Sequence, residues 1–276
     1  MIKDEVVIGG KSYSRKDCFA KALSLNPTDP KAWDNLGNAL STGTEKISLD
    51  GSIQKYNRVE CFLNAIAIDA EYVEAWLSLS RVLNTEEVHV PTFGLMDRRD
   101  CILRSIAINR NLPAPWIAMG EYIGPYDVMA MRGETFTRRE AFAQAATVDS
   151  SCSLAWIRLA GTLGHQDRIV VNGTSISKMG AYGRALENDP LDSEPWLLVG
   201  VGCPQAEAVE TPSGRKITKR DCFVRALEIN PRNPGGWQNL ALTMTPREKV
   251  VVDGQTLSQR DCYMKALSVD PRPRHH

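Results

Sequence analysis

The chain has 276 residues, and its 33 basic side chains are balanced by 33 acidic ones. A formal net charge of zero argues against a partner held by its negative charge, such as nucleic acid or an anionic membrane surface. No stretch approaches the roughly 18 apolar residues of a membrane span, and residues 1–10 lack the long apolar segment of a signal peptide.

Two sequence markers recur along the chain at a period of about 40 residues. The first marker is tryptophan, at Trp33, Trp76, Trp116, Trp156, Trp196 and Trp237. The second is a small residue in a separate segment, cysteine in five copies and alanine in two, at Cys18, Cys61, Cys101, Ala141, Ala181, Cys222 and Cys262. Because both markers keep the same spacing, the sequence predicts a single array of repeats over residues 1–276.

Residues 1–27 are predicted to form a β-hairpin followed by one helix. Gly9-Gly10 supplies the positive φ angles of a tight hairpin turn. Ser14 and Asp17 have the spacing of a capping box, which begins a helix, and Pro27 disfavours helical geometry in the residue before it. The same helix-start pattern recurs at Asn57 with Glu60, Thr137 with Glu140, Thr218 with Asp221, and Ser258 with Asp261.

Residues 28–70 are predicted to form the first complete unit, which contains a helix, a hairpin and a second helix. Asp29 is suited to cap the first helix, with Pro30 at the first helical position, where its missing N–H costs nothing. Later units place Asp192 and Asn233 at the same capping position, the second followed by Pro234. The residues after Trp33 follow the one-face spacing of a helix, at Leu36, Gly37 and Leu40. Asp50-Gly51 then predicts the turn of a hairpin.

The same unit is predicted five more times, with only residues 272–276 left as a tail. The predicted units are 71–110, 111–150, 151–190, 191–231 and 232–271. Hairpin turns are expected at Arg132-Gly133, Asn172-Gly173 and Asp253-Gly254. Pro91 and Pro212 predict looser hairpins in the other two units. A lone hairpin is marginal in water, so each is expected to pack against a helix or a neighbouring hairpin.

This pattern of two helices resembles the tetratricopeptide repeat. The residues that carry the resemblance are Trp33, Leu36, Gly37, Phe19, Ala22 and Pro27, and in a later copy Trp237, Leu240, Phe223, Ala226 and Pro231. The family's repeat has about 34 residues, so each unit here holds about six more between its helices. The resemblance implies a mostly α fold, a right-handed α-solenoid of helix pairs, with a short β-hairpin inserted in each repeat.

In that family the first helix of each pair lines a concave groove that holds peptides. Residues one and five positions after each tryptophan would face this groove. The candidate partner-binding residues are Asn38, Leu77, Arg81, Ile117, Glu121, Ile157, Leu197 and Gln238. The apolar ones predict a stripe that receives a helix or an extended segment of a partner protein. The alternative is that the hairpins, or a tighter superhelix, cover the stripe.

The sequence lacks the residue clusters that enzymes use. Its four histidines lie in different repeats or at the tail, and its glycines do not have the spacing of a phosphate-binding loop. We therefore expect no enzymatic activity, no cofactor and no metal. A position that accepts either cysteine or alanine indicates packing, and free thiols suit the reducing cytoplasm. The alternative location is an extracellular or cytoskeletal assembly.

Two functions follow as hypotheses. The first is a protein–protein interaction scaffold that binds a segment of a partner along the first helices of the repeats. The second is a structural protein whose repeats assemble, as a homo-oligomer, into a filament or a larger complex. Neither hypothesis includes nucleic acid or a membrane as partner.

Overall fold

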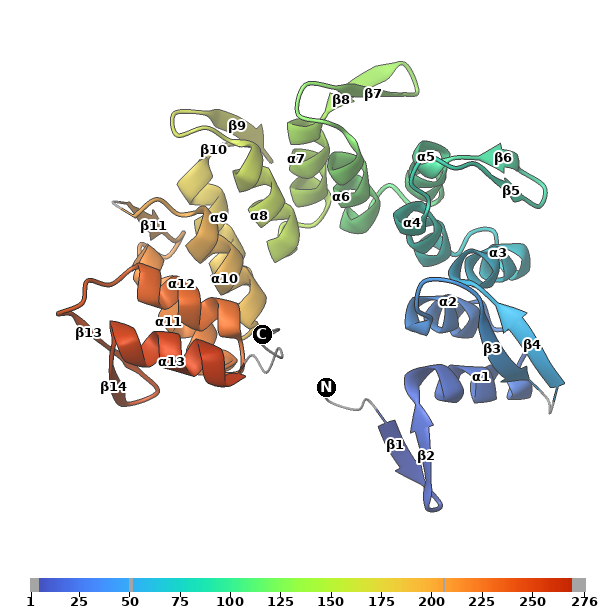
Figure 1. Ribbon diagram of the computed structural model, residues 1–276. Coiled ribbons are helices and arrows are strands. Elements are labelled where there is room, and N and C mark those ends of the chain that lie inside the picture. The colour runs from blue at the N-terminus through green and yellow to red at the C-terminus, as the bar shows by residue number, and fades with distance from the viewer. Residues whose placement is uncertain (1–4, 50–51, 206, 270–276) are drawn as a thin grey trace. The chain divides into compact units, whose positions relative to one another are not determined.

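Helices and two-stranded hairpins follow one another in a constant order along the chain (Figure 1). The structure is a computed structural model, and it describes residues 5–49, 52–205 and 207–269. The predicted helix-hairpin-helix repeats are confirmed. The chain divides into two compact units, residues 1–124 with 129–135, and residues 125–128 with 136–276. The predicted turn at Asp50-Gly51 and the predicted helix end at Asp270-Pro271 lie outside the described residues. A single array and a right-handed superhelix stay predictions.

The helices that carry the Cys/Ala marker, which we call B helices, each span 11 residues in the described part of the chain. They are α1 (Arg15–Leu25), α3 (Arg58–Ile68), α5 (Arg98–Ile108), α7 (Arg138–Val148), α9 (Lys178–Asn188), α11 (Lys219–Ile229) and α13 (Gln259–Val269). The predicted capping boxes are confirmed: at α1 the Ser14 side chain accepts from the Asp17 N–H, and Asp17 accepts from the Ser14 N–H at 3.0 Å. The box formed by Asp97 and Asp100 at α5 was not predicted.

The helices that carry the tryptophans, which we call A helices, are shorter by one or two residues. They are α2 (Pro30–Ala39), α4 (Val73–Val82), α6 (Pro113–Tyr122), α8 (Ser153–Thr162), α10 (Ser193–Gly202) and α12 (Pro234–Leu242). The predicted caps Asp29, Asp192 and Asn233 each accept a backbone N–H. At α2 and α12, Pro30 and Pro234 hold the first helical position, as predicted.

Every tryptophan makes the same hydrogen bond. The indole Nε1 of Trp33 donates to the carbonyl of Pro27, six residues earlier, at 2.9 Å. The other five indoles donate to the carbonyl six residues earlier at 2.8 to 3.2 Å. This carbonyl lies just after the end of the preceding B helix, so each tryptophan joins an A helix to the corner before it. The buried indole is thereby satisfied, as a buried polar group must be.

The hairpins connect each A helix to the B helix that follows it, and one further hairpin precedes α1. They are β1 (Glu5–Ile8) with β2 (Lys11–Ser14), β3 (Glu45–Leu49) with β4 (Ser52–Tyr56), β5 (Val88–Val90) with β6 (Gly94–Met96), β7 (Val128–Met131) with β8 (Glu134–Thr137), β9 (Arg168–Val171) with β10 (Thr174–Ser177), β11 (Ala208–Glu210) with β12 (Lys216–Thr218), and β13 (Lys249–Val252) with β14 (Gln255–Ser258). The positive φ angles predicted at the turns are confirmed, for example 49° at Asn172 and 74° at Gly173. The hairpins near Pro91 and Pro212 have strands of only three residues.

Each hairpin forms a sheet of its own, and four of the hairpins pack against the B helix of the preceding repeat. In the described residues, hairpin strands pair only within their hairpin. Strands β3, β9, β11 and β13 lie against α1, α7, α9 and α11, the B helix of the preceding repeat. The strand residues on this face are buried, including Ile47, Val171, Val209 and Val252. The expectation that hairpins pack against helices is confirmed for these four hairpins.

Ion pairs also join consecutive repeats at three of these contacts. Lys16 Nζ at the start of α1 lies 2.6 Å from Glu45 Oε2, Arg139 pairs with Asp167 at 2.6 Å, and Arg220 pairs with Glu248 at 3.1 Å. Each carboxylate also accepts a backbone N–H of the loop after its A helix, from Ser41, Gly164 and Thr245. Each of the three carboxylates thus stabilises the loop of its own repeat and also binds a cationic side chain of the previous repeat.

Glu45 predicts a measurable pH dependence of stability. Hydrogen bonds from the Lys16 ammonium, and then from the Ser41 hydroxyl and N–H, lower its pKa from 4.5 to about 2. A carboxyl with a lowered pKa in the folded state stabilises fully above pH 4.5 and loses this contribution as pH falls toward 2. We expect Glu45→Gln to lower the thermal midpoint at pH 7, and the difference from wild type to vanish near pH 2. A difference that stays constant across this pH range would contradict the assignment.

Candidate binding groove

A groove runs along the outer face of two neighbouring A helices, α8 and α10, in the second unit. It consists of two hollows of about 480 and 840 Å³. The hollows share Ile157, Arg158 and Leu198, so they adjoin. All lining residues belong to the second unit. This is the size range of sites that take small molecules or short peptide segments.

Helical periodicity decides which side chains reach this groove. Trp156 and Trp196 point into the core, where they are 1 % and 4 % exposed. Residues one, two and five positions after a buried residue lie on the flank and the opposite face of a helix. Arg158 and Gly161 of α8 and Val201 of α10 occupy such positions and line the groove.

The middle of the groove is apolar. Ile157 is buried, Leu198 is half-buried, and Val201 is 60 % exposed. Gly161 contributes empty space, because a Cβ atom built on it would meet no atom within 4 Å. The groove therefore has open space beside the glycine and aliphatic side chains around it.

Carboxylates line one end of the groove, at the start of α10. Asp189 lies at the corner before the helix, Asp192 caps the helix by accepting the Glu194 N–H at 3.0 Å, and Glu194 lies in the first turn. Acids at a helix N-terminus are favoured by the helix dipole. In the part of the chain that the structure describes, none of the three carboxylates forms an ion pair.

Arginines line the other end, at the start of α7. Arg139 donates to the carbonyl of Thr162 at 2.8 Å and to Asp167 at 2.6 Å. The backbone N–H of Gly164 and the guanidinium of Arg139 hold the pKa of Asp167 below its ordinary value. Arg138 lies over the ring of Phe142, 5.8 Å from its centroid. This end is thus lined by Arg138, Arg139 and Glu140, whereas carboxylates outnumber cations at the other end.

The predicted partner-binding residues are divided between the core and the surface. Ile157 lines the groove, and Leu197 packs toward Gly236 of α12. Leu77 and Ile117 are 3 % and 7 % exposed. The exposed members of the predicted set are Asn38, Arg81, Glu121 and Gln238.

Asp34, directly after Trp33, shows how a residue at this position becomes buried between two A helices, α2 and α4. In the first unit Asp34, next to Trp33, is 6 % exposed and accepts from Asn38 Nδ2 at 3.2 Å. Asn38 also donates to Ser78 of α4 at 3.3 Å. Burial raises the pKa of Asp34 above its ordinary value.

Sequence reasoning missed the position two residues after the tryptophan, which carries Arg158 and Leu198 in the groove.

The cysteine markers lie in the helix packing. Cys61, Cys101, Cys222 and Cys262 are fully buried, and Cys18 of α1 is half-buried. Burial raises the pKa of Cys61, Cys101 and Cys222 to about 12. A thiol with a raised pKa is a poor nucleophile, because the thiolate is the reactive form.

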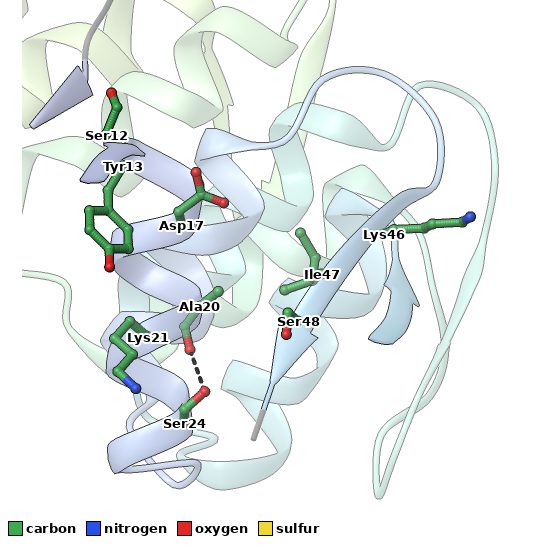
Figure 2. Close-up of a pocket in the computed structure, with 9 residues that line it drawn as sticks. All are labelled: Ser12, Tyr13, Asp17, Ala20, Lys21, Ser24, Lys46, Ile47 and Ser48. Carbon is green, nitrogen blue, oxygen red and sulfur yellow. Dashed lines mark hydrogen bonds between the residues drawn. The ribbon is translucent and has the colours of Figure 1, made fainter. Parts of the chain in front are cut away.

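A hollow in the first unit, between α1 and β3, is a weaker candidate. Its volume is about 540 Å³ (Figure 2). The Ser24 hydroxyl donates to the carbonyl of Ala20 at 3.1 Å, and Asp17 belongs to the capping box of α1. Figure 2 shows the Lys46 ammonium pointing away from the other lining residues. Ser24 and Asp17 are thus engaged locally, and Lys46 is directed elsewhere.

Comparison with known proteins adds no relative. No model of a known protein family matches the chain, and no curated protein has a similar sequence.

Among the described residues, no three His, Cys, Asp or Glu side chains are grouped to hold a metal ion. No helix within the same residues has the length and apolar character needed to cross a membrane.

Proposed function

We propose that the protein is a non-enzymatic scaffold that binds a segment of a partner protein in the groove over α8 and α10. The observation that supports this most is the apolar middle of the groove, formed by Ile157, Leu198 and Val201 around the space at Gly161. Apolar side chains that line a concavity are typical of binding sites, and Val201 is the exposed one of these three. The resemblance to tetratricopeptide repeats, whose first helices line a peptide groove, adds support, and a right-handed solenoid is part of the proposal.

The proposal includes a cytoplasmic location. All seven cysteines are free, and four of the repeat cysteines are fully buried. Free thiols at this density suit a reducing compartment.

Replacing Val201 tests the proposal. Val201 and Leu242 each lie five residues after a tryptophan and are 60 % and 65 % exposed, but only Val201 lines the groove. We expect Val201→Asp to weaken capture of a partner from an extract of the source cells at least tenfold, because it places a charge in the apolar middle. Leu242→Asp is the matched control and should leave capture unchanged. Equal capture by both variants and wild type would contradict the proposal.

Self-assembly is the second candidate function, and the exposed face of α13 favours it. Leu267 is 58 % exposed, whereas residues at the same position of the other B helices are at most 3 % exposed, at Leu23, Ile66, Ile106, Ala146, Leu186 and Leu227. Met264 on the same helix is 57 % exposed. An apolar helix face of this kind can pack against a second copy of the chain.

Sedimentation velocity over a concentration series tests self-assembly. If α13 mediates it, the sedimentation coefficient of wild type rises with concentration at tens of micromolar, and Leu267→Glu removes the rise. Leu191→Glu is a control, since Leu191 is 75 % exposed but lies at a corner between helices. A wild-type protein that sediments as a monomer over the whole series would rule this function out.

A further inference from the structure

We infer that the occupant of the groove is a short extended protein segment with lysine or arginine at one end, followed by aliphatic residues. The inference rests on the proposed function and assigns the chemistry and the orientation of the segment. It is carried by three features of the groove: its charge, its apolar middle and its length.

The charge of the groove fixes where a cation binds. Asp189, Asp192 and Glu194 lie within six residues of one another and form no ion pair among the described residues. The hollow at this end is lined by these three carboxylates and by one cation, Arg158. A lysine or arginine of a partner therefore meets an excess of carboxylates there. An acidic segment would meet like charges there. Charge complementarity of this kind selects partners and sets their orientation.

The length of the groove fixes the size of the segment. Helix α8 has 10 residues, so the groove is roughly 15 Å long at about 1.5 Å per residue. An extended chain rises about 3.3 Å per residue, so about four or five residues fill this length. A helix of the same length would be too short to be stable in water before binding. An extended segment can place a cation at the acidic end and aliphatic side chains over Ile157, Leu198 and Val201.

An NMR titration of the isotopically labelled full chain tests the inference. Three blocked five-residue peptides serve as probes, each ending in alanine and two leucines and beginning with two arginines, two glutamines or two glutamates. At low salt we expect the arginine peptide to bind about tenfold more tightly than the glutamate peptide. The glutamine peptide should be intermediate. The amide shifts should map to α8 and α10.

Removing the three charges supplies the decisive comparison. The variant Asp189→Asn/Asp192→Asn/Glu194→Gln keeps a hydrogen-bond acceptor at each position, including the helix cap, and removes only the charge. It should lose the preference for the arginine peptide over the glutamate peptide, because Arg158 is then the charged side chain left in this hollow. The matched control changes Asp69, Glu71 and Glu74 at the corner before α4 in the same way and should retain the preference.

The outcomes separate this inference from the proposed function. Binding of all three peptides in the groove with equal affinity would overturn the basic-segment inference while leaving the groove as a binding site. Tighter binding of the glutamate peptide would overturn it too. Failure of every peptide to shift any α8 or α10 resonance would overturn both.

Discussion

Gly183→Ala should lower the stability of the second unit by about 1–3 kcal/mol. A Cβ atom at this position of α9 would lie 2.3 Å from the carbonyl oxygen of Glu210 and 3.0 Å from the Cα of Thr211. Both atoms belong to the backbone at the end of β11 and the turn after it, so the hairpin must move away from the helix. Urea denaturation followed by circular dichroism measures the change.

Gly161→Ala is the matched control and should act in the opposite direction. Gly161 is also helical, but a Cβ atom there meets nothing within 4 Å. Alanine in a helix is favoured over glycine by about 0.5–1 kcal/mol, because glycine loses more backbone freedom on folding. If both substitutions lowered or both raised the stability, that result would contradict the close contact described between Gly183 of α9 and the end of β11.

Trp156→Ala should destabilise the second unit by about 3–5 kcal/mol, the range for removing a large buried aromatic side chain. The Trp156 side chain is 1 % exposed, and its Nε1 donates to the carbonyl of Ser150 at 2.8 Å. Trp156→Phe keeps most of the apolar contact and removes the indole donor, while the Ser150 carbonyl still accepts from Asn188 Nδ2 at 2.7 Å. We expect it to cost less than the alanine substitution and still about 0.5–1.5 kcal/mol, the net contribution of one hydrogen bond.

Chemical denaturation of the two Trp156 variants checks these values. Tyr126→Ala is the control, since Tyr126 is 99 % exposed and its removal should change the stability very little. If Trp156→Phe were as stable as wild type, the indole hydrogen bond that recurs at all six tryptophans would not contribute to joining the repeats.

The helix starts and the hairpin turns could be predicted because their signals are local. A capping box such as Thr137 with Glu140 needs only two residues three positions apart, and Asn172-Gly173 alone specifies a turn with positive φ angles. The Asp97 box of α5 was missed although it obeys the same rule, because aspartate holds both positions. These features depend on residues close together in the sequence.

The groove could be predicted only in part, because it depends on contacts between repeats. The position directly after a tryptophan was predicted to face the groove, and Ile157 at this position does line it. Leu77 has the same position after Trp76, but its side chain is only 3 % exposed. Their burial is set by how closely neighbouring A helices approach, and the sequence of one repeat does not specify this distance. The carboxylates at the start of α10 were recognised only through Asp192 as a helix cap.

Gly161→Leu is the most direct test of the claim that a partner segment binds over α8 and α10. The substitution fills the open space beside Gly161, where a Cβ atom meets nothing within 4 Å, so it blocks the groove without disturbing the core. Binding of the captured partner, measured by calorimetry with purified proteins, should be lost in Gly161→Leu and retained in Gly161→Ala, with neither variant melting below wild type. Undiminished binding by a folded Gly161→Leu protein would contradict the claim.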